Sequence, residues 1–93
     1  ADTYRARLWR SIRARRAFGL HDIVLDAVRA ERDAQDEARR YVRQLEAAGY
    51  LAPMPGRSRG WRLVRDPGPL APVWSQARRA IRDPNAEAGH GRS

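Results

Sequence analysis

Apolar residues recur every four positions near the start of the chain and predict a first helix. Residues 3–18 read TYRARLWRSIRARRAF, and the spacing places Tyr4, Leu8 and Ile12 on one stripe. A single stripe of this kind is typical of an amphipathic helix with one buried face. Arg15 falls on the apolar side, so we expect either that the helix is ending there or that the side chain reaches out to water.

Two further apolar stripes predict a second and a third helix with a tight connection between them. The second lies in residues 19–30, and its buried face comprises Leu20, Ile23, Val24, Ala27 and Val28. The third runs from an N-cap at Asp33 to Gly49, where a C-terminal glycine belongs. Its buried face comprises Ala34, Ala38, Tyr41, Val42, Leu45 and Ala48. Two short helices in this order form the helix-turn-helix pattern.

A β-hairpin is predicted directly after the third helix. Residues 50–54, YLAPM, form a short extended run, and residues 55–60, PGRSRG, form a turn that contains two glycines. Residues 61–64, WRLV, alternate in side-chain character with the period of a strand. A hairpin in this place corresponds to a wing. Trp61 shares a face with Leu63, so we expect Trp61 in the core rather than as a stacking platform.

The remaining chain is predicted to be a proline linker followed by a weak helix. Residues 66–72, DPGPLAP, contain three prolines, which remove backbone donors and favour an extended path. Residues 73–83, VWSQARRAIRD, read as a helix with its apolar residues on one side. These residues are Val73, Trp74, Ala77 and Ile81. Such a stripe must be buried, either against Trp9 of the first helix or against a second copy. We expect the second copy, which makes the stripe a candidate homodimer interface.

The pattern divides the chain into three parts. Residues 3–66 are predicted to form a winged helix-turn-helix domain, mainly α with a short β-hairpin. Residues 67–82 are predicted to be the proline linker and the C-terminal helix. Residues 83–93 are predicted to be a flexible tail, because NAEAGHGRS at the end has no apolar anchor other than alanine.

Composition narrows the classes of protein without changing this outline. The 93 residues suffice for one small domain. The absence of cysteine excludes a disulfide framework and cysteine-ligated zinc. No apolar run approaches the roughly 18 residues of a membrane span, and no signal peptide is visible. We therefore expect a cytoplasmic protein with no membrane partner.

The net charge of +8 arises from an excess of arginine, since the chain contains no lysine. Residues 1–18 carry six arginines and one aspartate, and residues 51–65 carry four arginines and no acid. A bias that replaces lysine with arginine accounts for the arginine usage but not for the positive excess. Because arginine matches phosphate and guanine geometrically, the excess favours a nucleic-acid partner.

The third helix presents the candidate base contacts. Its exposed face carries Gln35, Arg39, Arg40 and Arg43. The first three are predicted to reach base edges and Arg43 to lie near phosphate, since arginine pairs with guanine and glutamine with adenine. The alternative is a face that balances its own charge. Asp36 can pair with Arg39 or Arg40, and Glu46 can pair with Arg43.

The predicted wing supplies a second set of candidate DNA contacts. Arg57, Arg59 and Arg62 belong to it, and the first two flank a serine at its tip. An arginine-bearing tip suits a phosphate or a minor groove. The alternative is a solvated hairpin tip with no partner.

No residue pattern indicates catalysis or a metal. His21 and His90 are isolated, with no carboxylate or second histidine at metal-ligand spacing. Ser11, Ser58 and Ser75 have no base partner at a suitable spacing, and no phosphate-binding loop or nucleotide fingerprint is present. We therefore expect no enzyme, no metal, no cofactor and no small-molecule substrate.

Three stretches resemble small winged-helix proteins of Mu-like prophages in bacteria. They are RLWRSIR with the following Phe18, EARRYVRQLEAAGYL at residues 37–51, and WRLVRDPGPLAPV at residues 61–73. The resemblance covers Arg7 to Val73. LEAAGYL is similar to the end of the third helix and the first wing strand in many winged helices. The more specific part is the run from Trp61 to Pro72.

The resemblance implies a winged-helix fold and a phage-type transcriptional regulator or accessory factor that binds double-stranded DNA at the bacterial nucleoid. Residues 33–49 would then enter the major groove, and residues 55–60 would contact phosphate or the minor groove. Arg15 departs from the pattern, which expects an apolar residue at the helix end. Two alternatives stay open: a winged helix that mediates protein assembly, and a non-specific architectural binder of nucleic acid.

Overall fold

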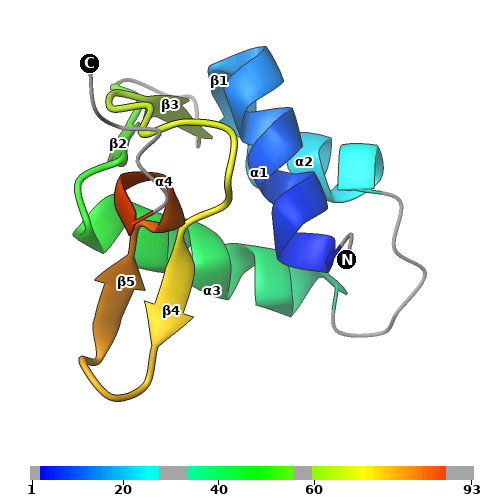
Figure 1. The fold of residues 1–93 in the computed structure, drawn as a ribbon. Helices are drawn as coiled ribbons and strands as arrows, with labels where there is room; N and C mark the ends of the chain where they lie inside the picture. Colours follow the sequence, from blue (N-terminus) through cyan, green and yellow to red (C-terminus); the bar gives the residue numbers. More distant parts are fainter. Residues whose placement is uncertain (1–2, 28–33, 56–59, 88–93) are drawn as a thin grey trace.

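The computed structural model describes residues 3–27, 34–55 and 60–87 of the chain (Figure 1). Three helices lie where the apolar stripes predict them: α1 (Tyr4–Arg15), α2 (Leu20–Ala27) and α3 (Ala34–Ala47). Gly49 follows α3 at a φ of 91°, the left-handed conformation that ends many helices. The predicted N-cap Asp33 and the predicted core residue Val28 lie outside the described residues.

A three-stranded antiparallel sheet follows the C-terminal ends of α1 and α3. Its strands are β1 (Ala17–Gly19), β2 (Leu51–Pro53) and β3 (Gly60–Leu63), in the order β1-β3-β2. β2 and β3 are the predicted wing strands, whereas β1 replaces the end of the predicted first helix. The helix ends at Arg15, Arg16 turns the chain with a φ of 65°, and Phe18 enters the core opposite Trp61 of β3. A helix continued to Phe18 would lose that strand pairing.

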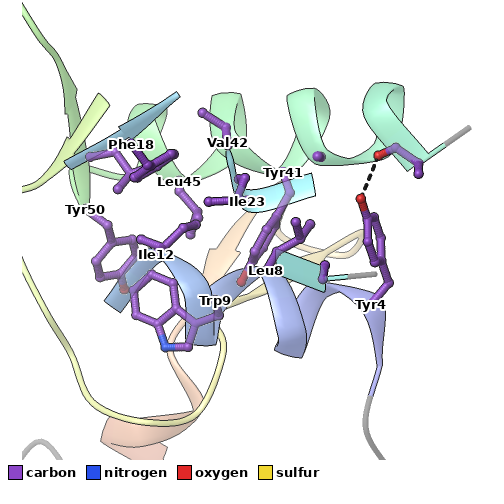
Figure 2. Close-up of a cluster of buried hydrophobic side chains, with 14 residues drawn as sticks. Tyr4, Leu8, Trp9, Ile12, Phe18, Ile23, Tyr41, Val42, Leu45 and Tyr50 are labelled. Atoms are coloured by element: carbon purple, nitrogen blue, oxygen red, sulfur yellow. Dashed lines mark hydrogen bonds between the residues drawn. The ribbon is translucent and has the colours of Figure 1, made fainter. Parts of the chain in front are cut away.

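One apolar core joins the three helices and the sheet (Figure 2). Of the positions predicted on α3, Ala34, Ala38, Tyr41, Val42 and Leu45 are buried and Ala48 is half-buried. On α2, Ile23 and Ala27 are buried, and Leu20 and Val24 are half-buried. Trp9 is a core residue, and its ring meets Tyr50 edge-on with 6.4 Å between centroids. Trp61 is half-buried and stacks on Phe18, which fits the expected core role in part.

The segment after Pro72 forms a β-hairpin, so the predicted C-terminal helix is wrong. β4 (Val73–Ser75) and β5 (Ala80–Arg82) pair antiparallel, and the short helix α4 (Pro84–Glu87) follows. Trp74 lies opposite Ile81, and side chains at opposite positions share one face of a hairpin. That face turns toward the domain, because Ile81 packs against the core. Val73 and Ala77 are exposed, so the four residues do not form the single stripe that the predicted dimer interface required.

The proline segment before this hairpin runs along the domain rather than away from it. The Trp9 indole N–H donates to the Gly68 carbonyl at 3.0 Å, and the Tyr41 hydroxyl donates to the Pro72 carbonyl at 2.7 Å. Both donors come from core side chains, so the segment is attached to α1 near one end and to α3 at the other. The proline segment therefore packs on the domain.

Asn85 fastens the end of the described chain to the same segment. Its buried side chain accepts the Leu70 N–H at 2.9 Å and donates to the Leu70 carbonyl at 2.7 Å. Gly68, with a φ of 138°, lies so close that a Cβ there would be 2.6 Å from Asn85 Oδ1. Residues 83–87 therefore belong to the domain and not to the predicted tail, whose residues 88–93 lie outside the described part.

Candidate nucleic-acid interface

The outward face of α3 carries a row of polar residues spaced four positions apart. Gln35, Arg39 and Arg43 form this row, and Arg40 lies beside it. Arg39 is half-buried and the other three side chains are exposed. The opposite face of the helix is fixed in the core by residues such as Leu45, so the row points away from the core. The four residues predicted on α3 as base or phosphate contacts therefore share one surface.

Two ion pairs within α3 agree in part with the alternative prediction, in which the acids and arginines of this face neutralise one another. Arg39 pairs with Asp36 at 3.3 Å, and Arg40 pairs with Glu37 at 3.4 Å. Both pairs lie at the surface, where a pair contributes about 0–1 kcal/mol. Contacts this weak exchange readily for another anion.

Glu46 is the third acid of α3, and it does not pair with Arg43 as a self-balanced surface would require. Glu46 accepts the Trp61 indole N–H at 2.9 Å, which ties β3 to the side of α3. No ion pair joins Arg43 to any residue that the structure describes. One guanidinium on the outward face is therefore uncompensated within the described chain.

A groove separates this face of α3 from the β4–β5 hairpin. It has a volume of about 420 Å³ and is lined by Asp36, Arg39, Arg40, Arg43, Gln44, Ala47 and Trp74. Figure 1 shows the hairpin passing α3, with its turn beyond the helix on the side away from α1 and α2. Arg78 and Arg79 lie in that turn and are exposed. The sequence pattern predicts a helix over these residues and gives no sign that the two arginines lie in a turn.

Arg62 is the predicted wing arginine that lies in the described residues, and it does not join the row on α3. Arg57 and Arg59 lie outside the described residues. Arg62 is exposed on β3, and Trp61 occupies the other face of that strand, from which it contacts Glu46. Because side chains alternate along a strand, Arg62 points away from α3.

Several arginines of α1 are engaged by acids of other elements. The contacts are Arg5 with Glu37 and Gln44 at 2.7 and 2.8 Å, Arg13 with Asp66 at 3.0 Å, and Arg15 with Asp26 at 2.6 Å. The positive charge of residues 1–18 is therefore offset locally. It contributes less to phosphate attraction than the sequence alone indicates.

Two side-chain donors hold the Asp26 carboxylate. It accepts hydrogen bonds from the Arg15 side chain and from the Ser11 hydroxyl, each at 2.6 Å. These bonds, with that from Arg15 foremost, lower the pKa of Asp26 from 3.8 to about 2. A carboxylate this acidic is a poor base for the Ser11 hydroxyl, so the pair does not form an activated nucleophile.

Other chemistry has little support in the described ranges. They contain no grouping of three or more metal-ligating side chains. His21 is exposed, and His90 lies outside these ranges. A cavity of about 690 Å³ beside Tyr50 is lined by charges of both signs, including Arg65 and Asp83. Within the described part of the chain, no helix is long and apolar enough to cross a membrane.

Comparisons of the chain with protein-family models, with curated proteins and with solved structures find no match. The resemblance to prophage winged-helix proteins therefore stays a prediction.

Proposed function

We propose that the chain is a winged helix-turn-helix protein that binds double-stranded DNA with α3 in the major groove. The order α1, β1, α2, α3, β2, β3 and the antiparallel three-stranded sheet support this assignment. In it, α3 is the recognition helix and the β2–β3 hairpin is the wing. The role that we propose is that of a phage-type transcriptional regulator or accessory factor.

The row of Gln35, Arg39 and Arg43 carries the proposal. Arginine forks match guanine, and the glutamine amide matches adenine, so we propose that Gln35 and Arg39 read base edges in the major groove and that Arg43 contacts phosphate. Arg43 has no acid to release among the described residues, and Arg39 leaves only a surface contact with Asp36. The helix α3 carries three arginines and three acids, and this balance of charge is therefore no barrier to DNA binding. Arg57, Arg59 and Arg62 of the wing remain proposed contacts to phosphate or the minor groove.

Salt dependence of duplex binding tests the proposal. Contact with about five phosphates predicts a log–log slope of roughly −4 to −5 in affinity against salt concentration, measured by anisotropy of a labelled duplex. The double variant Arg39→Gln/Arg43→Gln should lose at least about tenfold in affinity. Its slope should be shallower, with a magnitude reduced by about one to two units. The matched control Arg10→Gln/Arg16→Gln removes the same charge from α1 and the turn that follows it, and it should change both quantities much less.

Two results would decide against parts of this proposal. Absence of duplex binding near physiological salt would overturn it and favour the protein-assembly alternative. Equal losses in the α3 variant and its control would remove α3 from the interface. Selection from random duplexes separates base reading from architectural binding, because an architectural protein enriches no sequence.

A further inference from the structure

The β4–β5 hairpin is held in a fixed position beside α3. The Tyr41 hydroxyl holds the Pro72 carbonyl directly before β4, and buried Asn85 follows shortly after β5. Between these attachments, Ile81 packs against the core. The turn of the hairpin therefore projects from an anchored base, and its place relative to α3 is built into the fold.

The residue type at the end of this turn is unusual for its backbone conformation. Arg79 has a φ of 51°, in the left-handed region where glycine and asparagine are favoured and other side chains are disfavoured. The turn itself gives no reason for arginine there. Arg78 precedes it and is exposed as well.

The groove between the hairpin and α3 has the chemistry of an anion site with one apolar wall. Arg39, Arg40 and Arg43 face it with only one carboxylate, Asp36, among its lining residues. Trp74 forms the hairpin side, and its indole N–H donates to Gln76 at 3.3 Å. Apolar ring surface beside guanidinium groups keeps water away, and an arginine contact to phosphate is stronger there than in open solvent.

The dimensions of DNA place a phosphate strand at this groove. A helix with its side chains is about 10–12 Å across, and the major groove is about 12 Å wide. A helix that fills the groove has a phosphate strand along each side. An element that packs along a side of α3 therefore meets a strand, and the β4–β5 hairpin packs against α3.

We infer that the β4–β5 hairpin is a second DNA-contacting arm and that one phosphodiester strand of a duplex lies in the groove between it and α3. Arg40 and Arg43 hold the strand from the helix side, and Arg78 and Arg79 hold it from the turn. This inference rests on the proposed DNA binding. It adds a contact that is separate from α3 itself and from the β2–β3 wing.

A pair of matched substitutions tests the inference. Arg79→Asn and Arg16→Asn each replace an arginine at positive φ by asparagine, and each removes one charge. Arg16 lies directly before β1, at the opposite end of the molecule from the hairpin turn (Figure 1). The Arg79→Asn variant should have a melting temperature no lower than that of the parent protein. The magnitude of its salt slope for duplex binding should nevertheless be smaller by about one unit. Arg16→Asn should leave the slope unchanged.

Two further measurements do not depend on the backbone conformation at Arg79: a substitution of Arg78 and an NMR signal of Trp74. Arg78→Gln should also lower the slope by about one unit. The Trp74 indole N–H signal in an NMR spectrum, assigned through Trp74→Phe, should shift when a duplex is added. The indole N–H of the buried Trp9, which donates to the Gly68 carbonyl, should stay in place.

The outcomes separate this inference from the function on which it rests. Unchanged slopes in both hairpin variants, with the loss in Arg39→Gln/Arg43→Gln retained, would overturn the arm and leave DNA binding by α3 intact. A stationary Trp74 signal at saturating duplex would also overturn it. Tighter binding of a single strand than of a duplex of equal length would replace it with a stacking site at Trp74. No duplex binding by the parent protein would overturn both proposals.

Discussion

Residues 4–63 and residues 67–87 are held in place by different interactions. In the first region, apolar side chains such as Leu8, Ile12 and Leu45 are fully buried between three helices and a sheet. In the second region, the fully buried side chains are Pro72 and Asn85. Its attachment depends mainly on hydrogen bonds to backbone carbonyls, with Ile81 as a partly buried apolar contact. Substitutions that remove buried apolar volume should therefore destabilise the first region. Substitutions that remove a single hydrogen-bonding group should detach the second region from the first.

The largest effect is expected from Leu45→Ala in the first region. Leu45 is fully buried at the centre of the core face of α3, and the substitution leaves a cavity. We expect a loss of about 2–4 kcal/mol in the free energy of unfolding, measured by chemical denaturation. A thermal midpoint within about a degree of the parent would contradict the assigned packing of α3.

A smaller loss is expected from Asn85→Ala in the second region. The substitution leaves the Leu70 N–H and carbonyl without their side-chain partner. We expect a loss of about 1–3 kcal/mol in unfolding free energy. Gln76→Ala removes an exposed amide from the hairpin turn and should stay within about 0.5 kcal/mol of the parent. Equal effects of the two substitutions would mean that Asn85 does not anchor the segment.

Tyr41→Phe tests the direct link between the two regions. Burial raises the pKa of Tyr41 well above its usual range, so the hydroxyl stays protonated and donates to the Pro72 carbonyl. The substitution keeps the ring in the core and removes only this bond, and we expect a loss of about 0.5–1.5 kcal/mol. Amide hydrogen exchange should accelerate in β4 and β5 while α1 stays protected. Uniform acceleration would show that the regions open together.

The smallest effect is expected at the surface contact between α1 and α2, through Asp26→Asn. The folded-state pKa of Asp26 is about 2, below its ordinary value of 3.8, so the charged form is favoured by folding. Its stabilising contribution is present above about pH 4 and is lost as the pH falls toward 2. The difference in melting temperature between parent and variant should shrink over that interval. A constant difference would mean that the Arg15 contact does not persist in solution.

The two regions also differ in how far their sequences predict them. The apolar stripes of α1, α2 and α3 are local and wide, so their periods specify the buried faces. Trp74, Ala77 and Ile81 have a helical spacing too, but in the hairpin Trp74 and Ile81 lie opposite one another. Residues 76–79 contain no glycine, proline or asparagine to mark a turn. β1 escaped prediction because its three residues are too few to show an alternating pattern.

The candidate site also has one part that the sequence predicts and one part that it does not. The row on α3 follows from the helical period, because exposed positions are those left over by the buried face. The approach of Trp74, Arg78 and Arg79 depends on the path of the proline segment, which long-range contacts at Gly68 and Pro72 determine. The engagement of Arg5 and Arg13 by acids far along the chain has the same origin. Local sequence pattern carries no information about such contacts.

If DNA lies on α3 beside the β4–β5 hairpin, a duplex should perturb the amide NMR signals of both elements. A duplex is titrated into isotopically labelled protein, and changes in the amide NMR signals are followed residue by residue. We expect the largest changes on α3 from Gln35 to Arg43 and in the β4–β5 turn at residues 76–79, with small changes in α2. Changes confined to α1 and α2, or no change at saturating duplex, would show that DNA does not lie on this surface.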